Sequence, residues 1–317
     1  MQLPQYARDV QTNRAGPIVQ TVITDLGAQL DPLPRWSANL NAIQGAEPEH
    51  RSQRWWSEQS DKLLLNAMSS TLPDRDQARL LEQQNGLTAS WMRATPHPQL
   101  HTTISTEDYV LSLKWWLGMP IIHQTKGATR CPGCDAMVDA WGDHLVCCPR
   151  NNYASRHNAI QEVLFEALST AGQGVAKEVM IPNQSDQHLR PADLLLSAWD
   201  NGQPTAFDLT VVHGWQQSTK QGKERWRNFL RLKERHKHDK YDIPCQQAGW
   251  SFATAALGTW GGWGPEAAQQ IKRICKRVCA WHDGSERPQK EGELLERLGL
   301  TLMRQVARLL KAKNYIV

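Results

Sequence analysis

Apolar residues recur at intervals of three and four near both ends of the chain, and this spacing predicts amphipathic helices. Near the C-terminus, residues 293–313 carry a stripe of leucine, methionine and valine, which predicts a helix that packs on the outside of the molecule through this apolar face. Ser105 precedes Glu107 and Asp108 in a pattern typical of a helix N-cap. The predicted N-terminal helices are 54–68, 69–85 and 105–118.

The spacing of apolar residues changes after about residue 150, where segments with the two-residue period of strands alternate with helical segments. Asn201 and Gly202 separate two such strands and are typical of a two-residue hairpin turn. Pro265 is typical of the first position of a helix. We therefore expect a mixed α/β fold in the order helix, three strands, helix, strand, helix. The predicted segments are 156–172, 175–181, 190–199, 205–213, 219–241, 249–260 and 265–281.

Composition and charge indicate the cellular location of the protein and the kind of partner that it binds. The chain has 317 residues, an odd number of cysteines and no apolar leader or bilayer-length run, so we expect a nuclear or other intracellular protein, neither secreted nor membrane-bound. The net charge of the chain is only +4, but residues 220–240 contain nine lysine and arginine residues and only three acidic residues. This run is typical of a nucleic-acid contact, and a solvated helix face is the alternative.

A cysteine and histidine cluster follows the N-terminal helices, with the spacing C-x2-C-x9-H-x3-C. Thiolate and imidazole groups at this spacing can close a tetrahedron around one zinc ion. The predicted ligands are Cys131, Cys134, His144 and Cys148, and Cys147 is the alternative for the last position. We expect a structural rather than catalytic zinc, because all four positions are filled by protein.

Two aspartates interrupt the apolar strands on either side of the hairpin. With Asn201 and Gly202 as the turn, Asp193 lies opposite Thr210, and Asp208 is its diagonal neighbour on the same face. Two carboxylates at this separation can converge on one Mg²⁺ or Mn²⁺ ion, which lowers the pKa of a water and neutralises charge during phosphodiester cleavage. The alternative is that Asp193 caps a strand and that Asp208 faces solvent.

These segments resemble a known family over about residues 90 to 280. The order α-β-β-β-α-β is that of the PD-(D/E)XK nuclease core. The stretches GDHLVCC, RHNAI, RPADLLL, AFDLTVVH, KHDKY and GWSFATAALGTWGGWGPEA resemble the C-terminal region of non-LTR retrotransposon proteins with a restriction-like endonuclease. The segment before the knuckle, WMRATPHPQLHTTISTEDYVLSLKWWLGMP, resembles the linker of those proteins.

The resemblance implies an activity and its partners. It implies a zinc knuckle that positions nucleic acid and a nuclease that nicks DNA, so that the freed 3′-hydroxyl primes reverse transcription. The implied partners are DNA, element RNA and a reverse transcriptase on the same or a separate chain. No two aspartates are adjacent, so the paired-aspartate polymerase motif is absent, and we expect a detached tail or an independent descendant.

The chain departs from the family pattern at Thr210, which stands where a lysine is usual. Helix geometry returns the later half of the basic helix towards the acids, so we expect Lys237, or Lys240 as the alternative, to replace that lysine. Glu178 or Glu162 is expected to add a further acid. The competing hypothesis is a nucleic-acid-binding module that keeps the fold without cleavage, and a structural or protein-interaction role comes third.

The same reading assigns nucleic-acid contacts and domain boundaries. The residues expected to contact nucleic acid are Arg156, His157, Arg190, Lys223, Arg225 and Arg227. The expected parts are a loose arm at 1–50, a helical linker at 51–125, the knuckle at 126–150, the nuclease domain at 151–285 and a C-terminal helix at 286–317.

Overall fold

The computed structural model divides the chain into two units, Met1–Pro73 and Asp74–Val317. The described residues are 61–67, 71–84, 89–122, 130–151, 154–181, 190–200, 202–215, 228–280 and 287–311. The predicted arm at 1–50 and three predicted nucleic-acid contacts, Lys223, Arg225 and Arg227, lie outside these residues. The sheet, the knuckle and the candidate site all belong to the second unit.

A four-stranded sheet forms the centre of the second unit, with its strands in chain order. It consists of β1 (Val175–Val179), β2 (Ala192–Asp200), β3 (Gln203–Val212) and β4 (Ser251–Gly258). The first three strands are antiparallel, and β4 runs parallel to β3. A parallel neighbour needs a crossover, which α11 (Phe229–Gln247) provides. The predicted order of helix, three strands, helix and strand is therefore confirmed, and the fold is mixed α/β.

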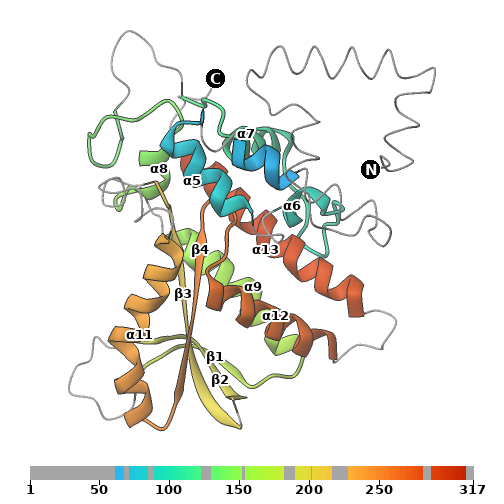
Figure 1. The fold of residues 1–317 in the computed structure, drawn as a ribbon. Helices are drawn as coiled ribbons and strands as arrows, with labels where there is room; N and C mark the ends of the chain where they lie inside the picture. The colour runs from blue at the N-terminus through green and yellow to red at the C-terminus, as the bar shows by residue number, and fades with distance from the viewer. Residues whose placement is uncertain are drawn as a thin grey trace, which may run out of the picture. The chain divides into compact units, whose positions relative to one another are not determined.

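Helices cover both faces of this sheet (Figure 1). On one face α9 (Ala154–Thr170) and α12 (Pro265–Ala280) pack over a core that includes Leu194 and Phe207, both 0% exposed. On the other face α11 contributes Tyr241 and Cys245 to a smaller core with Ala206. Phe207 and Ala206 face opposite helices because successive side chains of a strand alternate between the faces. The predicted helix 219–241 ends later than expected, at Gln247.

The N-terminal helices and the C-terminal helix share the larger core. They are α5 (Asp74–Gln83), α6 (Ser90–Arg93), α7 (Thr106–Leu117) and α13 (Arg287–Leu310). The predicted cap is confirmed, because Ser105 Oγ accepts a hydrogen bond from Asp108 N at 3.1 Å. Helix α13 contacts α6, α7, α9 and α12, so its apolar stripe belongs to the core that these helices share. Among the described helices, none combines the length and the apolar character needed to cross a bilayer.

The pairing of β2 with β3 corrects the predicted register. Asp200 pairs with Gln203, as the hairpin turn predicts, but the register shifts between Leu196 and Asp200, and Leu194 pairs with Phe207. Asp193 therefore lies level with Asp208 and not opposite Thr210. A shift of two residues keeps every side chain on its face, because strand side chains alternate with a period of two. The register therefore places the two aspartates side by side on adjacent strands, and their side chains contact different helices, Asp193 with α9 and Asp208 with α11.

Candidate functional site

The knuckle brings the four predicted zinc ligands together. Cys131 Sγ and Cys134 Sγ each lie 3.6 Å from Cys148 Sγ, and His144 Nε2 lies 3.0 Å from Cys134 Sγ. The four ligand atoms all lie within 4.8 Å of one another. Zinc bonds of about 2.0–2.3 Å in a tetrahedron give ligand separations close to these. The cluster can therefore hold one zinc ion.

The adjacent thiol of Cys147 does not join this group. Its Sγ lies 3.7 Å from the His144 carbonyl oxygen within α8 (Asp143–Cys147). The Cys148 thiol, by contrast, lies 3.6 Å from the sulfur atoms of both Cys131 and Cys134. Of the two alternatives, Cys148 is the one that the geometry favours.

A carboxylate that sequence reasoning missed shapes the knuckle. Asp139 accepts hydrogen bonds from the backbone N–H groups of Trp141, Asp143 and His144 at 3.0, 3.0 and 3.1 Å. These bonds fix the turn that carries the histidine ligand, which Gly142 allows with a φ of 81°. The sequence signal for this role is an aspartate, Asp139, that stands three residues before the glycine at the start of a helix.

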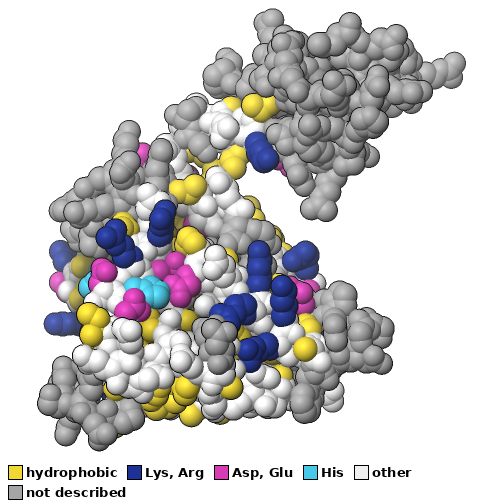
Figure 2. Space-filling model, turned by 60° about the horizontal axis from the view of Figure 1, so that its bottom comes forward, with side chains coloured by type: hydrophobic (Ala, Val, Ile, Leu, Met, Phe, Trp, Pro, Cys, Tyr) yellow, Lys and Arg dark blue, Asp and Glu magenta, His cyan; other side chains and the backbone are white. Residues whose placement is uncertain are grey.

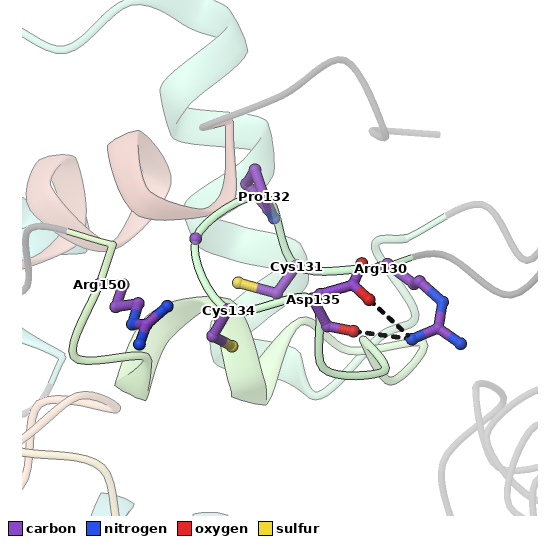
Figure 3. A pocket seen from close by; sticks show the side chains of 7 residues that line it. Arg130, Cys131, Pro132, Cys134, Asp135 and Arg150 are labelled. Atoms are coloured by element: carbon purple, nitrogen blue, oxygen red, sulfur yellow. Dashed lines mark hydrogen bonds and ion pairs between the residues drawn. The ribbon is translucent and has the colours of Figure 1, made fainter.

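A polar pocket lies beside the first cysteine pair of the knuckle, Cys131 and Cys134 (Figure 3). Arg150 and Arg130 extend on opposite sides of this turn. Arg130 Nη1 donates to both the backbone oxygen and the carboxylate of Asp135, at 2.9 and 3.2 Å. The knuckle thus presents two guanidinium groups on its surface beside the zinc ligands.

The candidate active site is a row of acidic residues that crosses three strands. Glu178 lies between the paired positions Lys177 and Val179, level with Asp193. Asp193 lies one step beyond the pair Leu194 and Phe207, level with Asp208. Residues directly opposite one another have Cβ atoms about 4.5–5.5 Å apart. The row therefore has one acid on each of the three strands.

Side chains from α9 hold two members of this row. Gln161 Nε2 donates to Glu178 Oε1 and to the Asp193 backbone oxygen, both at 2.8 Å. His157 Nε2 lies 3.4 Å from Asp193 Oδ1, and Leu209 N donates to Asp193 Oδ2 at 2.6 Å. Burial lowers the pKa of His157, but the neighbouring carboxylates outweigh it and raise the pKa overall. Ligand atoms of His157, Glu178 and Asp193 lie within 4.8 Å of one another and could hold a metal ion.

The third acid contacts the lysine chosen from helix geometry. Lys237 Nζ lies 2.8 Å from Asp208 Oδ1, and Thr210 Oγ1 donates to Asp208 Oδ2 at 3.1 Å. Asp208 is 3% exposed, and burial raises the pKa of its carboxyl although Lys237 opposes the change. Lys240, the alternative, is exposed, and its Nζ lies 4.7 Å from the centre of the Tyr241 ring.

The remaining predicted residues lie apart from this row. Glu162, the alternative acid, pairs with Lys177 at 2.7 Å instead. Arg156 is 2% exposed and donates to the Val146 carbonyl oxygen at 2.8 Å, so it joins α9 to the knuckle and has no surface for a phosphate. Arg190 is exposed just before β2.

Comparison with known proteins adds no relative. The sequence matches no model of a protein family and no curated protein.

Proposed function

We propose that this chain is a metal-dependent DNA endonuclease with a PD-(D/E)XK-type core and a structural zinc knuckle. The observation that carries the proposal is the ion pair of Lys237 with Asp208, 2.8 Å long, at the end of the acidic row formed with Asp193 and Glu178. Acids on adjacent strands and one lysine are the groups that hydrolysis of a phosphodiester needs.

Each group of the row has a separate task in this proposal. Asp193, with Glu178 and Asp208 on either side, would hold Mg²⁺ or Mn²⁺. When bound, the ion supplies a water of lowered pKa and neutralises charge on the phosphate. Lys237 stabilises the negative charge that develops on the attacked phosphate. Thr210 cannot supply that charge, but its hydroxyl holds the Asp208 carboxylate in place.

The surface charges suit a nucleic acid as substrate. Figure 2 shows acidic and histidine side chains gathered on one face, with lysine and arginine side chains on both sides of them. Arg231 and Arg235 on α11 are exposed, and Arg130 and Arg150 flank the knuckle. Basic side chains around an acidic centre bind the phosphate backbone while metal ions bind the acids. As in the proteins that the sequence resembles, the proposed nick would prime reverse transcription of an element RNA by a partner polymerase.

One observation favours a second candidate, a binding module without cleavage. Both oxygens of Asp208 already have partners, Lys237 and Thr210, and the group of three potential metal ligands does not include it. In an inactive module this ion pair would be a permanent structural contact. In the nuclease it rearranges when the metal and the substrate bind.

The test is a nicking assay with supercoiled plasmid and Mg²⁺ or Mn²⁺. We expect nicked circles only with divalent metal, and a loss of nicking in Asp208→Asn with DNA affinity kept. Asp239→Asn is the matched control, because Asp239 is an exposed acid on the neighbouring helix α11. Binding of DNA without nicking by the wild type favours the inactive module, and equal nicking by both variants contradicts the assignment of the site.

A further inference from the structure

His157 occupies a position that the acids alone do not explain. Its Nε2 lies 3.4 Å from Asp193 Oδ1, and only a quarter of its side chain is exposed. It lies one helical turn before Gln161, whose amide holds both Glu178 and the backbone of Asp193. The imidazole and the two carboxylates thus come from α9, β1 and β2 and converge at one point.

The backbone conformation at Glu178 indicates that the surrounding structure holds this residue in a fixed position. Glu178 has a φ of 53°, a value that L residues other than Asn and Asp seldom adopt, although it stands inside strand β1. Such a conformation is strained and persists only where the surroundings fix it. Here the hydrogen bond from Gln161 fixes the carboxylate beside His157 and Asp193.

We propose that His157 is a direct ligand of the catalytic cation together with Glu178 and Asp193, and that this site favours Mn²⁺ over Mg²⁺. The catalytic role of the cation rests on the proposed function, whereas the existence of the metal site does not depend on it. Mg²⁺ selects oxygen ligands and octahedral geometry, whereas first-row transition metals accept imidazole nitrogen. A donor set of one imidazole and two carboxylates therefore shifts the preference away from Mg²⁺.

The competing explanations give His157 other tasks. It could act as a nucleic-acid contact, or as an ion-pair partner that only orients Asp193. A phosphate contact needs exposed surface and affects DNA affinity and its salt dependence. An orienting partner leaves both metal affinity and the order of metals nearly unchanged when it is replaced. Metal binding measured without DNA separates these tasks.

The experiment measures Mn²⁺ binding to the zinc-loaded full chain without DNA, from loss of the electron paramagnetic resonance signal of free Mn²⁺, with Mg²⁺ as competitor. We expect His157→Ala to weaken Mn²⁺ binding about tenfold or more, because one of three protein ligands is lost. His157→Asp should restore binding but lower the preference for Mn²⁺ over Mg²⁺, because all three ligands are then oxygens. His236→Ala, an exposed histidine on α11, is the matched control and should bind as the wild type does.

The outcomes separate this inference from the proposed function. Unchanged Mn²⁺ affinity in His157→Ala, or an unchanged metal preference in His157→Asp, overturns the inference, and nicking by the wild type then still supports the nuclease. Loss of Mn²⁺ affinity in a chain that never nicks DNA supports the ligand and contradicts the nuclease. Thermal unfolding and zinc content of each variant, equal to those of the wild type, show that the fold is kept.

Discussion

Lys237 lies on helix α11 and Asp208 on strand β3, so their contact can be removed by changing one side chain and neither backbone. We expect Lys237→Met to reduce nicking about 10²- to 10³-fold, the range for loss of one group that stabilises transition-state charge. Methionine keeps a long apolar side chain in this half-buried position. DNA affinity and its salt dependence should stay nearly unchanged, because Lys237 Nζ faces a buried carboxylate. The measurement pairs a nicking rate with a binding isotherm at two salt concentrations.

The matched control for this prediction is Lys240→Met, one helical turn further on the same helix. Lys240 is exposed and its Nζ lies over the Tyr241 ring, so its loss should affect DNA affinity more than the cleavage rate. A parallel fall of affinity and cleavage in Lys237→Met would contradict its catalytic role and leave it a phosphate contact.

At the residue scale, sequence reasoning located the groups that interrupt a pattern. Asp193 and Asp208 stand out as acids in apolar strands, and Lys237 follows from helical periodicity. The structure places Lys237 Nζ 2.8 Å from Asp208 Oδ1, and the catalytic role of Lys237 stays a prediction. Gln161 and the ligand geometry of His157 were missed, because a polar residue on a helix gives no signal of its partner. Only the packing of α9 against the sheet brings them to the acids.

At the element scale, the hairpin shows what a local pattern can and cannot determine. The turn residues correctly predict the pair Asp200 and Gln203. The register shift between Leu196 and Asp200 could not be predicted, because the segment contains no glycine or proline to mark an irregularity and its pattern is that of a continuous strand. The shift of two residues keeps the alternation of the strand, and it places Asp193 level with Asp208 instead of opposite Thr210.

The knuckle gives a prediction with adjacent residues as variant and control. We expect purified protein to carry about one zinc ion per chain, and Cys148→Ser to lose most of it, because the Cys148 thiolate lies 3.6 Å from two other ligands. Cys147→Ser should keep its zinc, because that thiol faces a carbonyl oxygen. Metal analysis by mass spectrometry with thermal unfolding measures both. Loss of zinc in Cys147→Ser with retention in Cys148→Ser would reverse the assignment.

At the scale of the whole molecule, buried polar contacts join the parts that sequence analysis treated separately. Arg75 on α5 donates two hydrogen bonds of 2.7 Å to Asp143, the first residue of the knuckle helix. His213, just after β3, has its Nε2 3.3 Å from Asp143 Oδ1. These residues are distant in sequence, and a buried ion pair has no periodic signal. This is why the helical linker, the knuckle and the sheet read as separate segments but share one core.

A second buried acid ties α5 to the turn after β4, and it makes the stability of the compact unit depend on pH. Glu82 Oε1 accepts hydrogen bonds from Trp260 N and Gly262 N at 2.8 and 3.1 Å. Burial raises the pKa of Glu82 to about 8. Among the described residues, Glu82 Oε2 has no hydrogen-bond partner, and burial without a partner costs far less for a neutral carboxyl group than for a carboxylate.

The sign of the pH dependence follows from this shift. Between the ordinary pKa of about 4.3 and the folded value of about 8, the folded chain holds one more proton at Glu82 than the unfolded chain does. Its contribution to stability is therefore complete below the ordinary value and is lost as pH rises through about 8, at no more than about 1.4 kcal/mol per pH unit. Glu82→Gln is neutral at every pH and keeps an acceptor oxygen. We expect the free energy of unfolding of this variant to rise relative to the wild type between pH 5.5 and 7.5, measured by urea denaturation, whereas the exposed Glu291→Gln should show no such trend. A difference between Glu82→Gln and the wild type that is constant over this range would mean that Glu82 is ionised in the folded chain.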